Sequence, residues 1–199
     1  IIKREDGDHA NFAKELPSEA FNNSYMKSVR KIMLEGNVPT SCTKCFEEEA
    51  EGIVSKRVWE TGAWHLDGMD IPALINTTEE DGSIPFKVPY WDLRLGHTCN
   101  LKCVMCSPHD SSMWVADHKK IIPITKSELV KTQMGWKPEE FNNQWYENPR
   151  FWDEIYSQIP NIKHLYFAGG EPLLIKEHKK FLLEIIEKGH APSIHLRYN

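Results

Sequence analysis

Near the start of the chain, apolar residues recur three and four positions apart, a spacing typical of an amphipathic helix. We predict this helix over residues 18–35, with Ser18 as its cap and with Gly36 and Pro39 at its end. Its apolar stripe comprises Tyr25, Met26, Val29, Ile32 and Met33. An acidic stretch that begins at Phe46 predicts a second helix, whose buried face would consist of Phe46, Ala50, Ile53 and Val54.

Further along, the period of the pattern changes from helix to strand. Residues 90–96 alternate between apolar and charged side chains, which predicts a strand. Residues 162–168 and 193–199 predict a second and a third strand, and residues 181–186 predict a helix between them that is closed by Gly189. This order is typical of right-handed βαβ units around a parallel sheet.

The region between the first two strands, residues 111–160, is irregular and rich in tryptophan. We predict one helix after Asp110 and a short helix near residues 150–157. The tryptophans of this region either pack under the insertion or form a platform for a substrate; they are Trp114, Trp136, Trp145 and Trp152. On the third strand, His195, Arg197 and Asn199 project from one side, either toward a ligand or against a helix.

Composition is that of a globular protein. Of the 199 residues, 40% are apolar and 27% are charged, and the formal net charge is −5. This balance excludes a disordered tail, and no apolar run approaches the roughly 18–20 residues that span a bilayer. The acidity argues against a broad nucleic-acid surface, although a local basic groove stays open.

Five cysteines fall into two groups and nowhere else. Cys42 and Cys45 form a C-x-x-C pair, and Cys99, Cys103 and Cys106 form a C-x3-C-x2-C group. A secreted disulfide framework usually has an even number of cysteines at varied spacings. Spacings of two and three residues instead favour thiolates that converge on one metal centre.

The C-x3-C-x2-C group begins just after the first predicted strand, where parallel α/β folds place their chemistry. Three thiolates can hold three irons of a [4Fe–4S] cluster and leave the fourth iron open to an outside ligand. Zinc is the alternative, but a structural zinc site needs four protein ligands, usually in paired C-x-x-C knuckles. The spacing therefore favours an iron–sulfur cluster over zinc.

In this cysteine group and in a second motif, the chain resembles the radical S-adenosylmethionine (radical SAM) superfamily. Residues 99–106 match its cysteine signature, and residues 168–172, Ala-Gly-Gly-Glu-Pro, resemble its GGEP motif at the end of the next strand. Residues 39–57 look like the cysteine loop of twitch- or SPASM-type members, which carry an auxiliary cluster.

The resemblance implies the first half of a partial (β/α)6 TIM-like barrel of parallel strands, preceded by a small helical cysteine-containing region. It divides the chain into a twitch/SPASM-like segment at 1–60, a connector at 61–88 and the N-terminal half of the radical SAM barrel at 89–199. In this interpretation the chain is a fragment, truncated after the third strand of the barrel, that by itself is inactive.

For the site, the resemblance implies that Cys99, Cys103 and Cys106 ligate the [4Fe–4S] cluster and that its open iron chelates the methionine part of S-adenosylmethionine. Met105 stands where relatives often have an aromatic residue near the adenine, and it is apolar enough to pack there. Gly169 and Gly170 would bring backbone carbonyl and amide groups close to the ammonium of S-adenosylmethionine. Within the same motif, Glu171 would add a charge-assisted bond, and Pro172 completes the turn.

Cys42 and Cys45 leave more than one interpretation. By itself a C-x-x-C pair is a zinc knuckle, a redox pair or half of a cluster site, and no predicted strand precedes it as in a thioredoxin-like unit. The resemblance implies two ligands of an auxiliary iron–sulfur cluster, the alternatives being zinc or no metal.

The implied activity is reductive cleavage of S-adenosylmethionine to a 5′-deoxyadenosyl radical that abstracts hydrogen from a substrate. Relatives of the SPASM type imply a peptide or protein substrate. The implied reductive chemistry calls for a flavodoxin- or ferredoxin-type electron donor, and the cluster's need for reduced thiols implies a cytoplasmic setting. The alternatives are a radical SAM enzyme acting on a small molecule, and a non-catalytic iron–sulfur or zinc scaffold.

Overall fold

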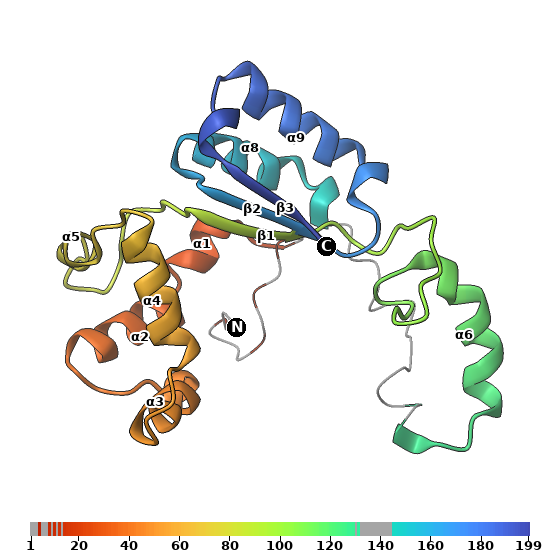
Figure 1. Cartoon of the computed structure of the whole chain (residues 1–199), viewed down its shortest axis with the longest axis horizontal. Coiled ribbons are helices and arrows are strands. Elements are labelled where there is room, and N and C mark those ends of the chain that lie inside the picture. The colour runs from red at the N-terminus through yellow and green to blue at the C-terminus, as the bar shows by residue number, and fades with distance from the viewer. Residues whose placement is uncertain are drawn as a thin grey trace. The chain divides into compact units, whose positions relative to one another are not determined.

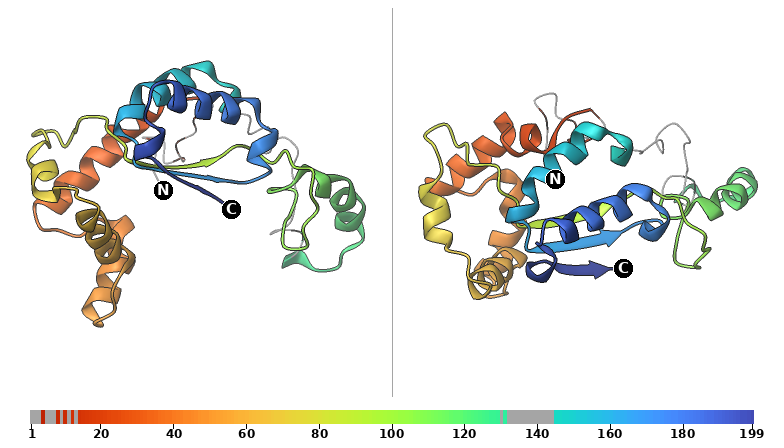
Figure 2. Two further views of the ribbon diagram at one scale, coloured as in Figure 1. Left: turned by 45° about the horizontal axis from the view of Figure 1, so that its top comes forward. Right: turned by 90° about the horizontal axis from the view of Figure 1, so that it is seen from above.

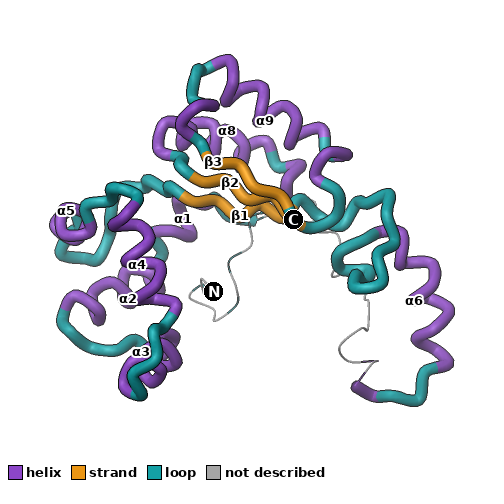
Figure 3. The backbone as a smooth tube through the Cα atoms, in the orientation of Figure 1, coloured by secondary structure: helices purple, strands orange, loops and turns teal. Residues whose placement is uncertain are grey.

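The computed structural model of the chain describes residues 4, 8, 10, 12, 14–129, 131 and 145–199. The chain divides into two compact units. The helical unit comprises Ile1–Ala10 and Pro17–Phe86, and the sheet unit comprises Asn11–Leu16 and Lys87–Asn199. Within the described residues, every strand belongs to the sheet unit (Figures 1 and 3).

Helices make up the regular structure of the helical unit. They are α1 (Pro17–Phe21), α2 (Ser24–Leu34), α3 (Thr43–Ala50), α4 (Lys56–Leu66) and α5 (Ile71–Asn76), with a 3₁₀ turn η1 (Thr40–Cys42) before α3. Residues 61–88, predicted as a connector, contain the end of α4 and all of α5. Up to Phe86 they belong to the helical unit.

The helix predicted over 18–35 is divided in two at Asn22 and Asn23. The Asn23 side chain accepts a hydrogen bond from the amide of Met26 at 2.9 Å, so Asn23 rather than Ser18 caps α2. Asn22 bonds both the amide and the carbonyl of Ile84, at 3.2 and 2.9 Å. The Asn22 side chain therefore binds a distant loop, the Asn23 side chain caps a new helix, and the predicted single helix is interrupted between them.

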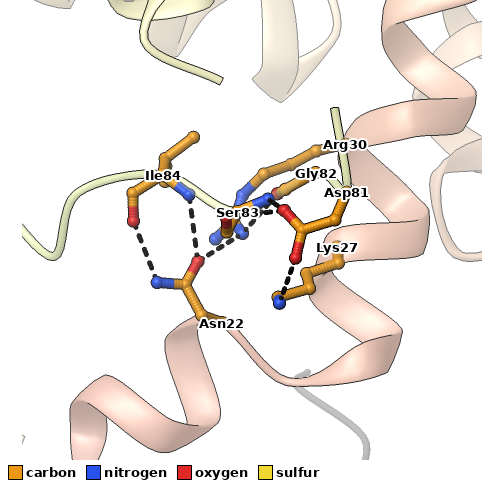
Figure 4. A network of polar contacts seen from close by, with 7 residues as sticks. All are labelled: Asn22, Lys27, Arg30, Asp81, Gly82, Ser83 and Ile84. Atoms are coloured by element: carbon orange, nitrogen blue, oxygen red, sulfur yellow. Dashed lines mark hydrogen bonds and ion pairs between the residues drawn. The ribbon is translucent and has the colours of Figure 1, made fainter. Parts of the chain in front are cut away.

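Figure 4 shows the rest of this contact between α2 and the loop at 81–84. The guanidinium of Arg30 donates to the carbonyl of Gly82 and to the side chain of Asn22. Lys27 forms an ion pair with Asp81 at 2.5 Å, and the pKa of Asp81 is lowered, first by that Lys27 hydrogen bond and then by those from Ser83. These bonds tie the last residues of the helical unit back to its first long helix.

The second predicted helix, α3, is shorter than expected. It ends at Ala50, and Gly52 then takes a left-handed conformation at φ 76°. Ile53 and Val54 are consequently 57% and 69% exposed, so the prediction that they are buried is wrong.

A polar cluster joins α3 to the start of α4. Glu49 accepts a hydrogen bond from Ser55 at 2.5 Å and pairs with Arg57, whose guanidinium lies 4.4 Å from the ring centre of Phe46. These hydrogen bonds, first from Ser55 and then from Arg57, lower the pKa of Glu49. Ser55, which is fully buried, also caps α4 through the amide of Val58.

The sheet consists of three parallel strands in the order β1-β2-β3. They are β1 (Tyr90–Arg94), β2 (His164–Ala168) and β3 (His195–Tyr198). Their register aligns Asp92 with Tyr166 and Tyr166 with Arg197. The strand positions agree with those predicted from the sequence, and the parallel pairing agrees with the predicted βαβ order of elements.

The prediction of half a (β/α)6 TIM-like barrel is wrong. The described residues form one open sheet of three short strands in a fold dominated by helices, and β1 pairs with β2 alone. Alternation along a strand specifies a buried and an open face, whereas a barrel also requires strand tilt and a closing partner. The sequence pattern carried the first kind of information and none of the second.

Helices cover one face of the sheet. Figures 1 and 2 show α8 (Pro149–Gln158) and α9 (Lys176–Glu187) side by side over the strands. The third helix described in the sheet unit, α6 (Val115–Ile121), lies beyond the end of the strands (Figure 1). Phe151, Phe181 and Phe167 are fully buried between these layers. The core therefore lies on the α8/α9 side of the sheet.

Tryptophans contribute to this core, which confirms the packing interpretation for two of them. Trp145 and Trp152 are 9% and 5% exposed, and the ring centres of Trp145 and Phe151 lie 4.6 Å apart. Trp114 is half-buried and contacts the cysteine loop instead, as described below. Trp136 lies outside the described residues.

Candidate cysteine-loop site

The cysteine loop begins where β1 ends. Leu95 is fully buried, and Gly96 then turns the chain at φ 68°. A Cβ at Gly96 would lie 2.8 Å from the ring of Tyr146, so only glycine fits between the strand and the residue that packs on it. This turn directs residues 97–110 beyond the carboxyl end of the sheet.

Hydrogen bonds from the residues that lead into α6 hold the loop in place. Ser112 donates its amide to the carbonyl of His97 at 2.7 Å, and its hydroxyl oxygen lies 3.2 Å from both the amide nitrogen and the carbonyl oxygen of Cys99. Ser111, which is 1% exposed, donates its hydroxyl to the carbonyl of Leu101 at 2.6 Å. The start of the loop is thus fixed through its backbone, and the cysteine side chains take no part in these bonds.

Trp114 holds the middle of the loop. Its indole N–H donates to the carbonyl of Cys103 at 2.9 Å, and Lys102 lies over its ring with the ammonium 4.7 Å from the ring centre. Lys102 also pairs with Asp117 of α6. Like the serine hydrogen bonds, these contacts hold the loop in its conformation without a bound group.

The two glycines after β2 meet this loop directly. Gly169 and Gly170 have φ values of 75° and 56°, and a Cβ at Gly170 would lie 2.5 Å from the carbonyl oxygen of Thr98. The amide of Gly170 donates to the carbonyl of Asp110 at 3.0 Å, and the amide of Glu171 donates to that of Thr98 at 2.8 Å. The turn after β2 is therefore joined to the cysteine loop by two backbone hydrogen bonds.

This contact changes the expected role of the glycines. The amide of Gly170 is used within the protein, so it is not free to approach a ligand as expected from the sequence. Among the described residues, nothing donates a hydrogen bond to the carbonyl oxygen of Gly169 or of Gly170. The glycines are required for close packing of two loops, and their carbonyl oxygens are the groups left for a ligand.

One cavity of about 910 Å³ lies at this junction. It brings together the predicted site residues of both motifs, namely Cys99, Cys103, Met105, Cys106, Gly169, Gly170 and Glu171. Pro172 is buried, does not line the cavity, and begins the 3₁₀ turn η7 (Pro172–Leu174). Two segments more than 60 positions apart in the sequence therefore share one concave site at the carboxyl ends of adjacent parallel strands.

The chain matches no known family model, no curated protein and no solved structure. Resemblance to a family therefore rests on the sequence motifs of this chain alone. The cavity geometry is an independent observation of this chain.

The three thiols of the cavity differ in their surroundings. Cys103 is exposed, whereas Cys99 and Cys106 are half-buried. Burial raises the pKa of the Cys106 thiol, and the neighbouring Cys103 and Asp110 raise it further. The amide of Leu101 lies 3.3 Å from the sulfur of Cys99 and donates to it. Such a bond stabilises a thiolate when a metal centre binds.

Within the described residues, no three or more His, Cys, Asp or Glu side chains are grouped closely enough for a metal ion. A single ion draws its donors to about 2.3 Å, whereas each iron of a cubane cluster takes its own thiolate, so the thiolates stand farther apart. Cys99, Cys103 and Cys106 line one open cavity, and three thiols are the donor set that a cubane cluster with one open iron uses.

Glu171 and Met105 occupy different parts of the cavity. One carboxylate oxygen of Glu171 accepts a hydrogen bond from the amide of Leu173 at 3.1 Å and so caps η7. Its carboxylate thus has a fixed position at the cavity wall. Met105 is 90% exposed, so its side chain is available to a bound molecule and contributes little to the protein core.

The other predicted cysteines lie in the helical unit. Cys42 is the last residue of η1, and Cys45 is in the first turn of α3. Both are half-buried free thiols, and the hydroxyl of Ser41 lies 3.8 Å from the Cys42 sulfur. This placement is compatible with each of the interpretations that the sequence left open.

Several residues of the site were not found from the sequence. Arg94 and Tyr166 line the cavity from β1 and β2, and Ser111, Ser112 and Trp114 support the loop. Asn199, which follows β3 and was already a candidate from the sequence, lines the cavity as well. A signal for the serines does exist, because short polar side chains ahead of a helix commonly bond nearby backbone. For the strand residues, membership in the cavity depends on register, which the sequence does not specify.

Searched along the described residues, the chain contains no helix long and apolar enough to cross a membrane.

Proposed function

We propose that the sheet unit binds a [4Fe–4S] cluster and S-adenosylmethionine, and that the protein acts as a radical SAM enzyme. One observation carries this proposal: the C-x3-C-x2-C loop and the Gly-Gly-Glu turn line the same cavity. Enzymes with parallel sheets use the space beyond the carboxyl ends of their strands for chemistry, which supports a catalytic interpretation of the cavity.

Cys99, Cys103 and Cys106 would hold the cluster, which when bound supplies the electron for reductive cleavage of S-adenosylmethionine. The carbonyl oxygens of Gly169 and Gly170 are acceptors suited to the ammonium of its methionine part, and the Glu171 carboxylate adds negative charge beside them. Ser111, Ser112 and Trp114 would keep the loop in shape as thiols are deprotonated.

The remaining parts of this proposal rest on the family resemblance. They are an auxiliary cluster that involves Cys42 and Cys45, a peptide or protein substrate, a flavodoxin- or ferredoxin-type electron donor and a cytoplasmic location.

Anaerobic reconstitution with iron and sulfide tests the cluster. We expect iron and acid-labile sulfide to bind the unaltered chain, and to be lost when Cys99, Cys103 and Cys106 are all changed to alanine. The matched control changes Cys42 and Cys45 to alanine and is expected to retain this cluster. Tightly bound zinc without acid-labile sulfide would support the alternative, a non-catalytic zinc scaffold.

Addition of dithionite and S-adenosylmethionine to the reconstituted protein then tests the reaction. The expected product is 5′-deoxyadenosine, formed only when the reconstituted protein is present. A cluster-loaded protein that forms no 5′-deoxyadenosine would refute the enzymatic proposal.

A further inference from the structure

The face of the sheet opposite α8 and α9 carries polar side chains. Residues alternate along each strand, so Leu93 and Phe167 point into the core while Arg94, Tyr166 and Arg197 lie on the other face. Within the sheet unit, α8 and α9 lie on the core side only, as Figures 1 and 2 show, and Arg94 and Arg197 are exposed.

This open face has an excess of positive charge. Arg94 and Arg197 face one acidic side chain, Asp92, and the Nε of Arg94 lies 3.5 Å from the Oδ1 of Asp92. Arg197 has no ion pair within the described part of the chain, and its guanidinium carbon lies 5.9 Å from the ring centre of Tyr166. Counted over the strand side chains alone, the face thus has a formal charge of about +1 with neutral histidines, in a chain whose net charge is −5. Asp110 and Glu171 lie in the adjoining cavity rather than on the strands.

Two histidines add to this character without adding fixed charge. His164 and His195 are register partners on β2 and β3, and their ring centres lie 5.6 Å apart. They stand one pleat away from Tyr166 and Arg197 on the same face. Imidazole N–H groups next to a guanidinium extend the set of hydrogen-bond donors along the face.

The open face runs into the cysteine cavity. Arg94, Tyr166 and Asn199 line that cavity, and Tyr166 is the direct register partner of Arg197. A molecule in contact with Arg197 and Tyr166 would therefore lie beside the cavity that holds the three thiols.

We propose that the open sheet face is a binding site for the carboxylate group of an organic molecule, with Arg197 as its charged partner and Tyr166 beside it. A guanidinium presents two parallel N–H donors that match a carboxylate in geometry. One unneutralised positive charge also matches a monoanion, whereas a phosphate dianion would leave negative charge uncompensated. That this molecule is the substrate rests on the proposed function, but its binding requires neither cluster nor S-adenosylmethionine.

The test uses the full 199-residue chain without iron. Benzoate, the uncharged benzamide of the same shape, and phenyl phosphate are titrated separately, and binding is followed by NMR of the arginine side chains and strand amides. We expect benzoate to shift the Arg197 and Tyr166 signals and to bind about tenfold more tightly than benzamide.

Variants assign the effect to one residue. Arg197→Gln is expected to weaken benzoate binding about tenfold, and Arg197→Lys, which keeps the charge but not the fork, to restore part of it. The control Lys179→Gln removes one positive charge from the exposed surface of α9, outside the proposed site, and should leave the affinity unchanged.

Equal affinity for benzoate and benzamide would overturn the proposal, as would a loss in Lys179→Gln equal to that in Arg197→Gln. Phenyl phosphate that binds more tightly than benzoate would replace the carboxylate by a phosphate. Because the measurement is made without cluster, its failure and the failure of cluster binding are separate results.

Discussion

Gly170→Ala is the substitution that tests most directly how the site is assembled. Alanine at φ 56° has to adopt a left-handed conformation, which costs about 1–2 kcal/mol. Its Cβ would also lie 2.5 Å from the carbonyl oxygen of Thr98, so the turn and the cysteine loop must separate. This separation would break two backbone hydrogen bonds, from Gly170 to Asp110 and from Glu171 to Thr98, each of which contributes about 1 kcal/mol to stability.

The expected loss in the free energy of opening at this junction is therefore about 3–4 kcal/mol, or two to three powers of ten in the opening equilibrium. Hydrogen exchange of the Glu171 amide measures it, because that amide is protected by the bond to Thr98. Gly189→Ala is the matched control: its φ is 75°, but nothing lies within 4 Å of the added Cβ. It isolates the conformational cost of about 1–2 kcal/mol. If Gly170→Ala lowered the free energy of opening by no more than Gly189→Ala does at its own site, the close packing of the two loops would be refuted.

The remaining predictions concern the core, the loop and pH. Phe151→Ala should lower the free energy of unfolding by about 3–5 kcal/mol in urea denaturation, because a fully buried ring leaves a cavity. Trp114→Phe should cost about 1 kcal/mol and reduce iron retention after reconstitution, since the bond to the Cys103 carbonyl is lost. Burial lowers the pKa of His178, with Glu171 acting in the opposite direction. As the pH falls below 6.5, this histidine is therefore protonated in the unfolded chain before it is protonated in the folded chain. The free energy of unfolding should decrease as the pH falls from 6.5 to the lowered pKa of the folded state, and His178→Gln should remove this pH dependence.

Each of these has a control that separates the cause from a general loss of stability. Leu183→Ala removes a side chain that is 46% exposed and should cost far less than Phe151→Ala. Trp59→Phe, at a site 63% exposed, should leave iron retention unchanged. Tyr198→Phe removes the hydroxyl 2.8 Å from His178 but keeps the imidazole, so the pH slope should persist. An equal effect in a control and its partner would contradict the corresponding reasoning.

The strands show how far a sequence pattern reaches. Alternation placed all three strands within about two residues, and their parallel order followed from the helix between the second and third. The pattern did not indicate whether the sheet closes into a barrel, because a strand shows the same alternation in an open sheet and in a barrel. The break at Asn22 was missed for a related reason, because its side chain bonds Ile84, a partner 62 positions away.

The sequence alone indicated which chemical groups the site contains. The spacing of Cys99, Cys103 and Cys106 and the Gly-Gly-Glu turn are local patterns, and local patterns determine which donors stand near one another along the chain. Folding brings these two motifs to one cavity and packs Gly170 on Thr98, and neither relation follows from the spacing of residues. Folding also places Arg94, Tyr166 and Arg197 on one open face. Those relations depend on strand register and on contacts between distant segments. The free energies of these contacts come from packing and backbone hydrogen bonds, which cannot be inferred from the spacing of residues along the chain.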